Sequence, residues 1–593
     1  MNRVPGRVRF GREAARWALT ALALAAVAPL SRPLFSQPFF TDDHAIRFFI
    51  AVMNFEGFAY TPFSNAGYFI GHSMYFSSTG LWFLLFKVLR CVPPHVLYNG
   101  FHLAWLLAAP LLCRVLAVLF LDDREEQETF IDWLLPFILV SDMIFIYAGS
   151  FHWAVATYGV CVFFALCERP NIGLLGTLGL SLLSGLVFFI NPLSIVPMAV
   201  FVLVQGCVAR RMPWKALAAL AAGLAGNIPA MLKTVPVLQG TSNCLLDDAY
   251  IAGPLLRRML LLRFHPAGNF FLGGMIPAAG MLLAAFARSV RARACRPGVC
   301  GYSILALIAY VLFCLGPGGN FGVNQTPLRM VFVIYPLFLL MLIRCGSGLL
   351  RRWVFLPGLF FAAAFSLQLL LKGPLLPAGL PPDFVRLQDW IAARTDGSGR
   401  ILLEEASHCF DSEGLLVHPL YGSHILPLLM LPGDRQYVSG VVPWVRRALY
   451  SRFWLMDGRL MDRPIEGYPL AELRRLFKDY NVRWIVCWTP ESERYFSGRP
   501  AYLERGPSFG LFKTFTVREK YSFLEGADGE VRFSKDSAQV HLRGRSRSAV
   551  LKLHYLKSMR TQPPLAVSRA ASEDPAGMVR IEYPAQDFTL YWE

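Results

Sequence analysis

Residues Arg16–Phe49 read RWALTALALAAVAPLSRPLFSQPFFTDDHAIRFF, and the fold is best interpreted outward from this stretch. Its apolar run, from Trp17 to about Leu34, follows five arginines among the first 16 residues. A basic flank before such a run is typical of a membrane segment whose N-terminus stays in the cytoplasm. A secretory signal has the same pattern, but the many apolar runs that follow favour an uncleaved anchor. We therefore expect the next loop, residues 36–67, to lie on the external side of a membrane.

The composition of the whole chain predicts many membrane spans. Of 593 residues, 55% are hydrophobic and 16% are charged, whereas a soluble domain averages about 25% charged residues. Further apolar runs of roughly span length lie near 68–86, 97–120, 130–148, 151–167, 172–190, 193–208, 214–232, 269–287, 300–316, 328–345 and 353–372. Residues 1–375 are thus predicted to form a polytopic α-helical transmembrane domain of about 11–13 helices.

The positive charge of the chain belongs to this apolar part. Of the net charge of +17, residues 1–372 carry +14 and residues 373–593 carry +3. Lys and Arg concentrate in the short cytoplasmic loops of membrane proteins, whereas a nucleic-acid face needs a basic soluble surface. We therefore expect no nucleic-acid partner. The basic clusters near 210–215, 288–296 and 344–352 are predicted to be cytoplasmic. Alternation then places the C-terminal part outside, which requires eleven or thirteen crossings rather than twelve, with the miscounted segment between 87 and 150.

The C-terminal part has the pattern of a soluble region. Residues 382–395 and 471–480 have helical spacing, whereas 400–404 and 482–488 have the pattern of strands, so 376–507 is predicted to be an α/β domain. From about Ser508 short alternating segments separated by turns predict a β-sandwich over 508–593.

The first external loop carries adjacent carboxylates, Asp42 and Asp43. Two interpretations are open. In the structural one, Thr41 or Asp42 caps a helix that lies at the membrane surface, with Phe48, Phe49, Ile50, Val52 and Met53 toward lipid. In the functional one, two neighbouring carboxylates raise one another's pKa, which would suit one of them to act as a general base.

Several stretches resemble a known superfamily. The Asp pair in the first external loop, Asn65–Leu89 (NAGYFIGHSMYFSSTGLWFLLFKVL) and Asn320–Leu342 (NFGVNQTPLRMVFVIYPLFLLML) resemble the GT-C membrane glycosyltransferases. The C-terminal patterns LQDWIAARTDGSGRILLEE and LFKDYNVRWIVCW, followed by a β-sandwich, are similar to YfhO-like and "6-pyruvoyl-tetrahydropterin synthase-related" membrane proteins of the same broad group. No residue pattern here indicates pterin chemistry.

The resemblance implies an enzyme of the bacterial cytoplasmic (inner) membrane. It would move a sugar from a polyprenyl-phosphate donor to an extracytoplasmic glycan, lipid or protein acceptor. Asp42 or Asp43 would be the catalytic base. Arg329, Arg263 and His265 would bind the donor phosphate, because Arg pairs well with phosphate oxygens. Candidate substrate contacts are His44, Glu56, His72, His152, Asn191 and Asn324.

Each of these assignments has a structural alternative. Arg329 could anchor the membrane interface or form an internal ion pair, and a lone His in an apolar run is more often packed than a ligand. Asn191-Pro192 stands where some relatives have His-Pro. Metal dependence, including use of Mg²⁺ or Mn²⁺, is therefore open.

Two other functions fit the same sequence. The chain could be a transporter or flippase of lipid-linked glycans, with Asp142 as the main candidate for an intramembrane ionisable residue. It could also be a non-catalytic scaffold whose β-sandwich binds glycan. No Walker A, HExxH, GxSxG or dinucleotide motif occurs, so nothing in the sequence supports ATP hydrolysis, zinc proteolysis or serine esterase chemistry.

Overall fold

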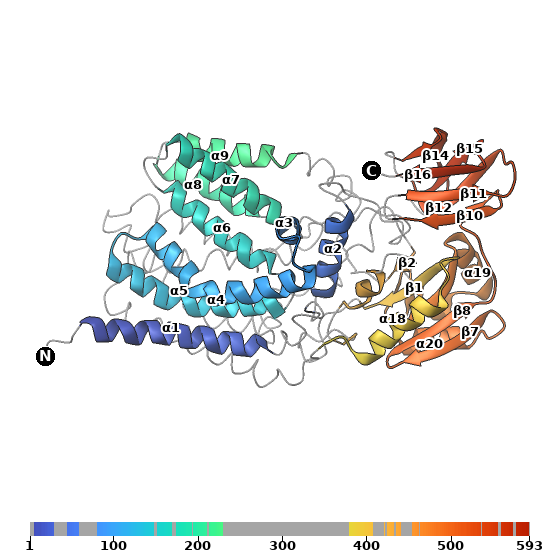
Figure 1. Ribbon diagram of the computed structural model, residues 1–593, viewed down its shortest axis with the longest axis horizontal. Helices are drawn as coiled ribbons and strands as arrows, with labels where there is room; N and C mark the ends of the chain where they lie inside the picture. Colours follow the sequence, from blue (N-terminus) through green and yellow to red (C-terminus); the bar gives the residue numbers. More distant parts are fainter. Residues whose placement is uncertain are drawn as a thin grey trace.

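The structure is a computed structural model in which a helical part and a β-rich C-terminal part lie side by side, with α2 between them (Figure 1). It describes residues 5–28, 39, 44–57, 80–147, 151–168, 173–191, 194–209, 213–228, 379–406, 420–421, 424–431, 435–439, 453–461, 463–534, 537–555, 559–572 and 577–591.

The described helical part contains α1 (Pro5–Val27), α2 (His44–Gly57), α3 (Gly80–Val88), α4 (Pro94–Phe120), α5 (Arg124–Tyr147), α6 (His152–Cys167), α7 (Leu174–Ile190), α8 (Ile195–Ala209) and α9 (Trp214–Ala225). Helices α4 to α9 coincide with six of the predicted apolar runs. Among the described residues, α4 is the one helix both long and apolar enough to cross a membrane, and α6, α7 and α9 are shorter apolar helices. The predicted spans from 269 onward lie outside the described residues.

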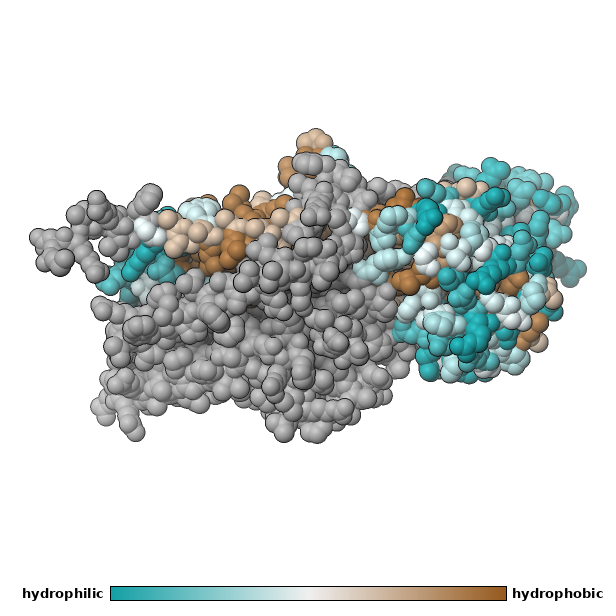
Figure 2. Space-filling model, turned by 90° about the horizontal axis from the view of Figure 1, so that it is seen from below, coloured by the Kyte–Doolittle hydropathy of each residue, from teal (hydrophilic) through white to brown (hydrophobic). Residues whose placement is uncertain are grey.

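One face of α4 is left apolar and exposed. Leu107, Leu111, Val115 and Val118 are each about half exposed and recur at helical spacing. The opposite face of α4 packs against α1, α5 and α6. Where described residues are visible from below, the helical part presents much hydrophobic surface, whereas the C-terminal part is mostly hydrophilic (Figure 2).

An ion cluster fixes α1 on α5. The Arg16 guanidinium is 4% exposed and lies 2.6 Å from Asp132, 2.7 Å from Glu128 and 2.8 Å from Glu13. Two of these carboxylates belong to α5 and one to α1, so the cluster joins the two helices at the end where α5 begins. Burying a guanidinium is costly unless it is paired and hydrogen-bonded, and here it is both.

The C-terminal part begins with an α/β unit whose elements follow from local sequence. Helix α18 (Pro382–Arg394) has Pro at its first position, Asp383 in its first turn and Arg394 in its last, all favourable placements. Its buried face is Phe384, Leu387 and Ile391. Helix α19 (Leu470–Asp479) and strand β6 (Val482–Cys487) confirm the predicted helix over 471–480 and strand over 482–488.

One eight-stranded mixed sheet organises this α/β unit. Its order is β5 (Arg463–Pro464), β4 (Arg459–Leu460), β3 (Leu455–Met456), β1 (Arg400–Glu405), β6, β8 (Phe512–Val517) and β7 (Leu503–Phe509), and β2 (Gln436–Ser439) pairs with β1. Strands β2, β3 and β6 run parallel to β1, and the remaining pairs are antiparallel. Three further helical elements belong to the described part of the unit, η5 (Leu426–Met430), η7 (Ile465–Gly467) and α20 (Pro490–Ser497).

The β-sandwich follows as two four-stranded sheets. One has the order β10 (Gly529–Phe533), β11 (Ser537–Leu542), β16 (Asp587–Tyr591), β13 (Arg560–Gln562), and the other β14 (Ala566–Ala570), β15 (Met578–Glu582), β12 (Ser548–His554), β9 (Leu524–Glu525). Because β7 and β8 pair within the α/β sheet, the sandwich starts at β9 rather than at the predicted residue 508. An alternating strand looks the same in either unit, so the pattern at 510–515 did not specify its partner strand.

Two buried cations lie where the α/β unit meets the sandwich. The Arg400 guanidinium, fully buried at the start of β1, donates to the carbonyl oxygens of Tyr480 and Lys552, and its carbon lies 4.8 Å from the Phe523 ring centre. Lys552 is 5% exposed and donates from Nζ to the carbonyl oxygen of Lys478. Among the described residues no carboxylate forms an ion pair with either cation. Burial lowers the pKa of Lys552 to about 8, with Arg400 adding to the effect while Glu525 and Asp479 oppose it.

The pKa of Lys552 predicts a pH dependence of stability. Its folded-state pKa of about 8 lies below the unfolded value of 10.5, so the unfolded chain binds more protons between these values and stability rises with pH there. Lys552→Met removes this dependence. We expect its free energy of unfolding, relative to that of the unsubstituted chain, to be about 2 kcal/mol higher near pH 7 than near pH 10.

Urea-dependent proteolysis of the full chain at the two pH values measures this difference. Lys520→Met, an exposed lysine of the same part of the chain, serves as the control and should show no such dependence. An equal stability change for Lys552→Met at both pH values would contradict the assignment.

Candidate active site

Residues 40–43, the acidic loop that contains Asp42 and Asp43, directly precede α2 in the sequence. His44 is the first residue of that helix. The His44 imidazole is fully buried. Its Nδ1 lies 2.9 Å from the Tyr98 hydroxyl, and its Nε2 bonds to the carbonyl oxygen of Ile146. A carbonyl oxygen only accepts, so Nε2 carries the hydrogen, and a neutral ring then accepts at Nδ1 from Tyr98. Both ring nitrogens of His44 are therefore used in joining α2 to α4 and α5.

The other flank of the acidic loop is held on the same turn of α4. The backbone N–H of Phe39 donates to Oδ1 of Asn99 over 2.8 Å. The Phe39 ring packs against His44 at 5.3 Å and His102 at 5.5 Å between ring centres. Phe39 and His44 bracket the loop segment, and both contact residues between 98 and 102. Asp42 and Asp43 themselves lie outside the described residues.

An aromatic and imidazole cluster completes this anchor. His102 stacks on Trp82 at 4.8 Å and donates from Nδ1 to the carbonyl oxygen of Tyr98 over 2.6 Å. Trp82, from α3, also packs on the Tyr98 ring at 4.3 Å. These residues were not predicted from the sequence. The signal was present, because Tyr98, Asn99 and His102 are polar groups at helical spacing inside an apolar run.

The described side chains of α2 are covered by protein. These side chains, of residues 44–49, 51 and 52, are all at most 7% exposed. A helix lying in the membrane interface keeps a polar face toward water. The prediction that Phe48, Phe49 and Val52 face lipid is therefore wrong. The physical reason is that α2 packs against α3 and α4 on the helical part and against η5 of the α/β unit.

The other predicted site residues are only partly visible in the described structure. His152, the first residue of α6, and Asn191, which follows α7, are both 3% exposed within the helical part. Glu56 lies in α2, but its side chain is outside the described set. His72, Arg263, His265, Asn324 and Arg329 lie outside the described residues. Among these candidates the described structure brings only His44 to the loop anchor, and all their assigned roles stay predictions.

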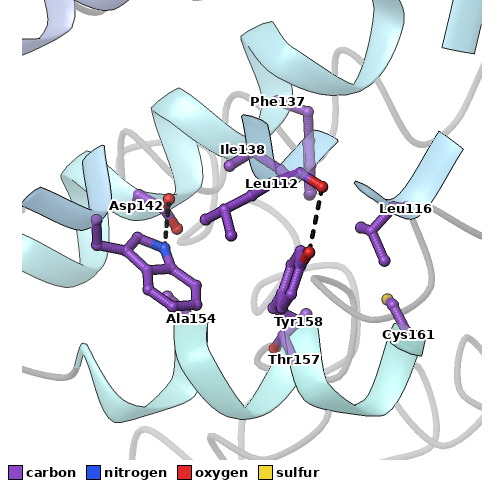
Figure 3. A pocket seen from close by; sticks show the side chains of 10 residues that line it. Leu112, Leu116, Phe137, Ile138, Asp142, Ala154, Thr157, Tyr158 and Cys161 are labelled. Atoms are coloured by element: carbon purple, nitrogen blue, oxygen red, sulfur yellow. Dashed lines mark hydrogen bonds between the residues drawn. The ribbon is translucent and has the colours of Figure 1, made fainter. Parts of the chain in front are cut away.

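A second polar feature lies between α4, α5 and α6. Asp142 is 3% exposed, and its Oδ2 accepts from Nε1 of Trp105 over 3.1 Å. It lines a small, mainly apolar pocket with Trp105, Thr157, Tyr158 and Cys161 among others (Figure 3). Tyr158 donates to the carbonyl oxygen of Leu112 over 3.3 Å. Within the part of the chain that the structure describes, no three His, Cys, Asp or Glu side chains gather to hold a metal ion.

Comparison with known proteins places the fold. No family model and no curated protein matches the chain. Among solved structures, ArnT from Cupriavidus metallidurans in the apo state is similar with a TM-score of 0.51 and 13% identity, over 85% of this chain and 98% of that chain. Archaeal oligosaccharyltransferase AglB from Archaeoglobus fulgidus, in complex with an inhibitory peptide and a dolichol-phosphate, gives 0.49 and 10%, over 80% and 69%.

Arabinofuranosyltransferase AftD from Mycobacteria gives a TM-score of 0.48 and 16% identity, and the chain spans 42% of its length. Of these three, only ArnT has a TM-score above 0.5, and the match covers 98% of its length. The chain therefore shares the fold of ArnT, and the resemblance to the GT-C superfamily stays a prediction. The narrower likeness to YfhO-like proteins also stays a prediction.

Proposed function

We propose that the chain is a membrane glycosyltransferase that moves a sugar from a polyprenyl-phosphate donor to an acceptor outside the cytoplasmic membrane. The observation that carries the proposal is the anchored loop: Phe39 and His44, on either side of the Asp pair, are both held on one turn of α4. A catalytic group must be held in a defined geometry to be effective. The fold shared with ArnT and the exposed apolar face of α4 support placement in a membrane.

The chemistry assigns one role to each predicted group. Asp42 or Asp43 takes the proton of an acceptor hydroxyl, whose oxygen bonds to the anomeric carbon of the donor sugar. The bond from that carbon to the phosphate oxygen breaks, and polyprenyl phosphate leaves with the electron pair. Arg329, with Arg263 and His265, would neutralise the leaving phosphate. His44, one peptide bond from Asp43, would hold the loop rather than touch substrate.

The remaining predicted contacts belong to the same proposal. Glu56, His72, His152, Asn191 and Asn324 are the candidate substrate contacts. A divalent cation, Mg²⁺ or Mn²⁺, would assist the leaving phosphate if one is bound. The N-terminus would be cytoplasmic, and the C-terminal α/β unit and sandwich would lie outside.

A direct transfer assay tests this function. The purified full chain in vesicles receives a polyprenyl-phosphate-linked radiolabelled sugar and a cell-envelope extract as acceptor. We expect label on the acceptor together with free polyprenyl phosphate in equal amounts. The absence of transfer from every polyprenyl-phosphate sugar tried, by a chain that is folded, would overturn the proposal.

One observation favours a second function, the transport of lipid-linked glycans. Asp142 is an ionisable residue buried among helices beside a pocket, and such residues often mark a transport path. In the same vesicles, movement of the labelled lipid across the bilayer without transfer would identify this activity. Asp142→Asn would then slow movement, whereas under the proposed transferase function it should leave chemistry nearly unchanged.

A further inference from the structure

The α/β unit makes direct contact with the helix that follows the acidic loop. Helix α2 packs against α3 and α4 on one side and against η5 on the other, and in Figure 1 it stands between the two parts of the molecule. Leu426, Leu428 and Leu429 of η5 share one hydrophobic core with Phe48 and Phe49 of α2. The position of α2 is thus determined by the α/β unit as well as by the helical part.

Two hydrogen bonds and one close polar contact link η5, or His424 just before it, to three different elements of the α/β unit. The buried Tyr437 hydroxyl, from β2, donates to the carbonyl oxygen of Leu429 over 2.8 Å. Gln388, from α18, donates to the carbonyl oxygen of Leu428 over 3.4 Å. Just before η5, His424 Nδ1 lies 3.5 Å from Oε1 of Glu405 at the end of β1, and both side chains are at most 1% exposed.

These contacts tie a short helical segment to strands β1 and β2 and to helix α18. A single turn has little stability of its own, so η5 keeps its place because β1, β2 and α18 hold it. Its apolar side chains then meet α2, whose first residue is joined to Asp43 by a peptide bond. A shift of η5 therefore displaces α2, the helix that follows the Asp pair in the chain.

We infer that η5 is a positioning element of the active site, through which the α/β unit sets the geometry of the Asp42–Asp43 loop. The inference rests on the proposed transferase function for its catalytic consequence, but its structural content is independent of that function. Residues of η5 and Tyr437 touch no substrate in this scheme. They act through α2, so their loss affects the chemical step more than binding of the donor.

Tyr437→Phe is the sharpest probe, because it removes one hydroxyl and keeps the ring. A matched control is Tyr468→Phe. The Tyr468 hydroxyl is also buried in the α/β unit and donates to a backbone carbonyl, that of Leu460, over 2.7 Å. It holds β4 rather than η5. Each substitution removes one hydrogen bond from a buried tyrosine hydroxyl to a backbone carbonyl, so both should destabilise the unit similarly.

Two measurements on the full chain in lipid nanodiscs decide the inference. For Tyr437→Phe we expect amide hydrogen exchange in α2 to accelerate at least about fivefold, with exchange in α4 unchanged. We also expect kcat to fall at least about fivefold while the donor KM stays within about twofold. For Tyr468→Phe, exchange in α2, kcat and KM should each stay within about twofold of the unsubstituted chain.

The exchange readout keeps the two proposals separate. If the unsubstituted chain transfers no sugar, the proposed function fails, but faster exchange of α2 in Tyr437→Phe alone still supports positioning by η5. Equal exchange of α2 in the two variants would overturn the inference, whatever the activity. The inference would also be overturned if kcat fell in both variants in proportion to their loss of stability.

Discussion

A chain carrying Asn at both position 42 and position 43 should insert and fold normally and lose transfer activity by about 10²- to 10⁴-fold, the typical contribution of a general base. The reason is that an amide has nearly the shape of a carboxylate but cannot take a proton near neutral pH. The measurement is kcat for transfer from the polyprenyl-phosphate donor in vesicles, with donor binding measured separately.

This substitution also separates the two interpretations of the Asp pair. Asn is as good a helix cap as Asp. If the pair only caps α2, the double variant Asp42→Asn, Asp43→Asn should retain nearly all its activity and stability. Retained activity would therefore refute the catalytic role and leave the cap as the explanation. The single variants then show which residue is the base, since only one of them should account for most of the loss.

The chain offers a matched control in a second adjacent pair, Asp122 and Asp123. Both are exposed in the turn before α5, and Oδ1 of Asp123 accepts from the backbone N–H of Glu126 over 2.9 Å. Asp122→Asn, Asp123→Asn makes the same chemical change with the same effect on net charge. We expect activity within about twofold of the unsubstituted chain, because this pair has only a capping role.

The local elements of the fold were predictable because their signals are local. The apolar runs that became α4 to α9 and the periodicity that became α19 and β6 depend only on neighbouring residues. The burial of Phe48 and Phe49 was not predictable in this way. An apolar side chain is stabilised by leaving water whether lipid or protein covers it, and some of the residues that cover α2 lie hundreds of positions away, in η5.

The candidate site was predictable to a similar extent. The Asp pair stood out because acidic residues are scarce in the first 372 positions. Its supports did not, because Tyr98, Asn99 and His102 meet Phe39 and His44 only through the packing of α2 on α4. Residues that hold a loop gain their role from tertiary contacts, so sequence spacing alone shows that they are polar without showing what they bind.

The partners of the charged residues in strand β1, whose sequence is RILLEE, were likewise not predictable from sequence spacing. The strand is buried along its whole length although half its residues are charged. One of these buried charges, that of Glu404, is stabilised by hydrogen bonds to both carboxylate oxygens. Its Oε1 accepts from the backbone N–H of Gly458 and the hydroxyls of Thr489 and Ser492, at 2.6 to 2.7 Å. Its Oε2 accepts from the N–H groups of Trp488 and Thr489 at 2.8 and 3.1 Å.

Glu404→Ala should lower the unfolding free energy of the α/β unit by about 3–5 kcal/mol, because several buried donors lose their acceptor at once. Glu404→Gln should cost less, about 1–3 kcal/mol, because one oxygen remains while the new amide N–H group faces the N–H groups of Trp488 and Thr489. Urea-dependent proteolysis of the full chain measures both values.

Glu466→Ala is the control for Glu404. Glu466 lies in the same α/β unit, is half exposed and makes an ion pair with Arg494 at 3.2 Å, so its loss should cost less than about 1 kcal/mol. The expected order of stability is Glu466→Ala, then Glu404→Gln, then Glu404→Ala. The expected destabilisation of β1 also bears on η5, because the next residue, Glu405, contacts His424 just before η5. If Glu404 secures the end of β1, its loss should also speed hydrogen exchange in α2. Unchanged exchange there, with β1 destabilised, would show that η5 keeps its place without the strand.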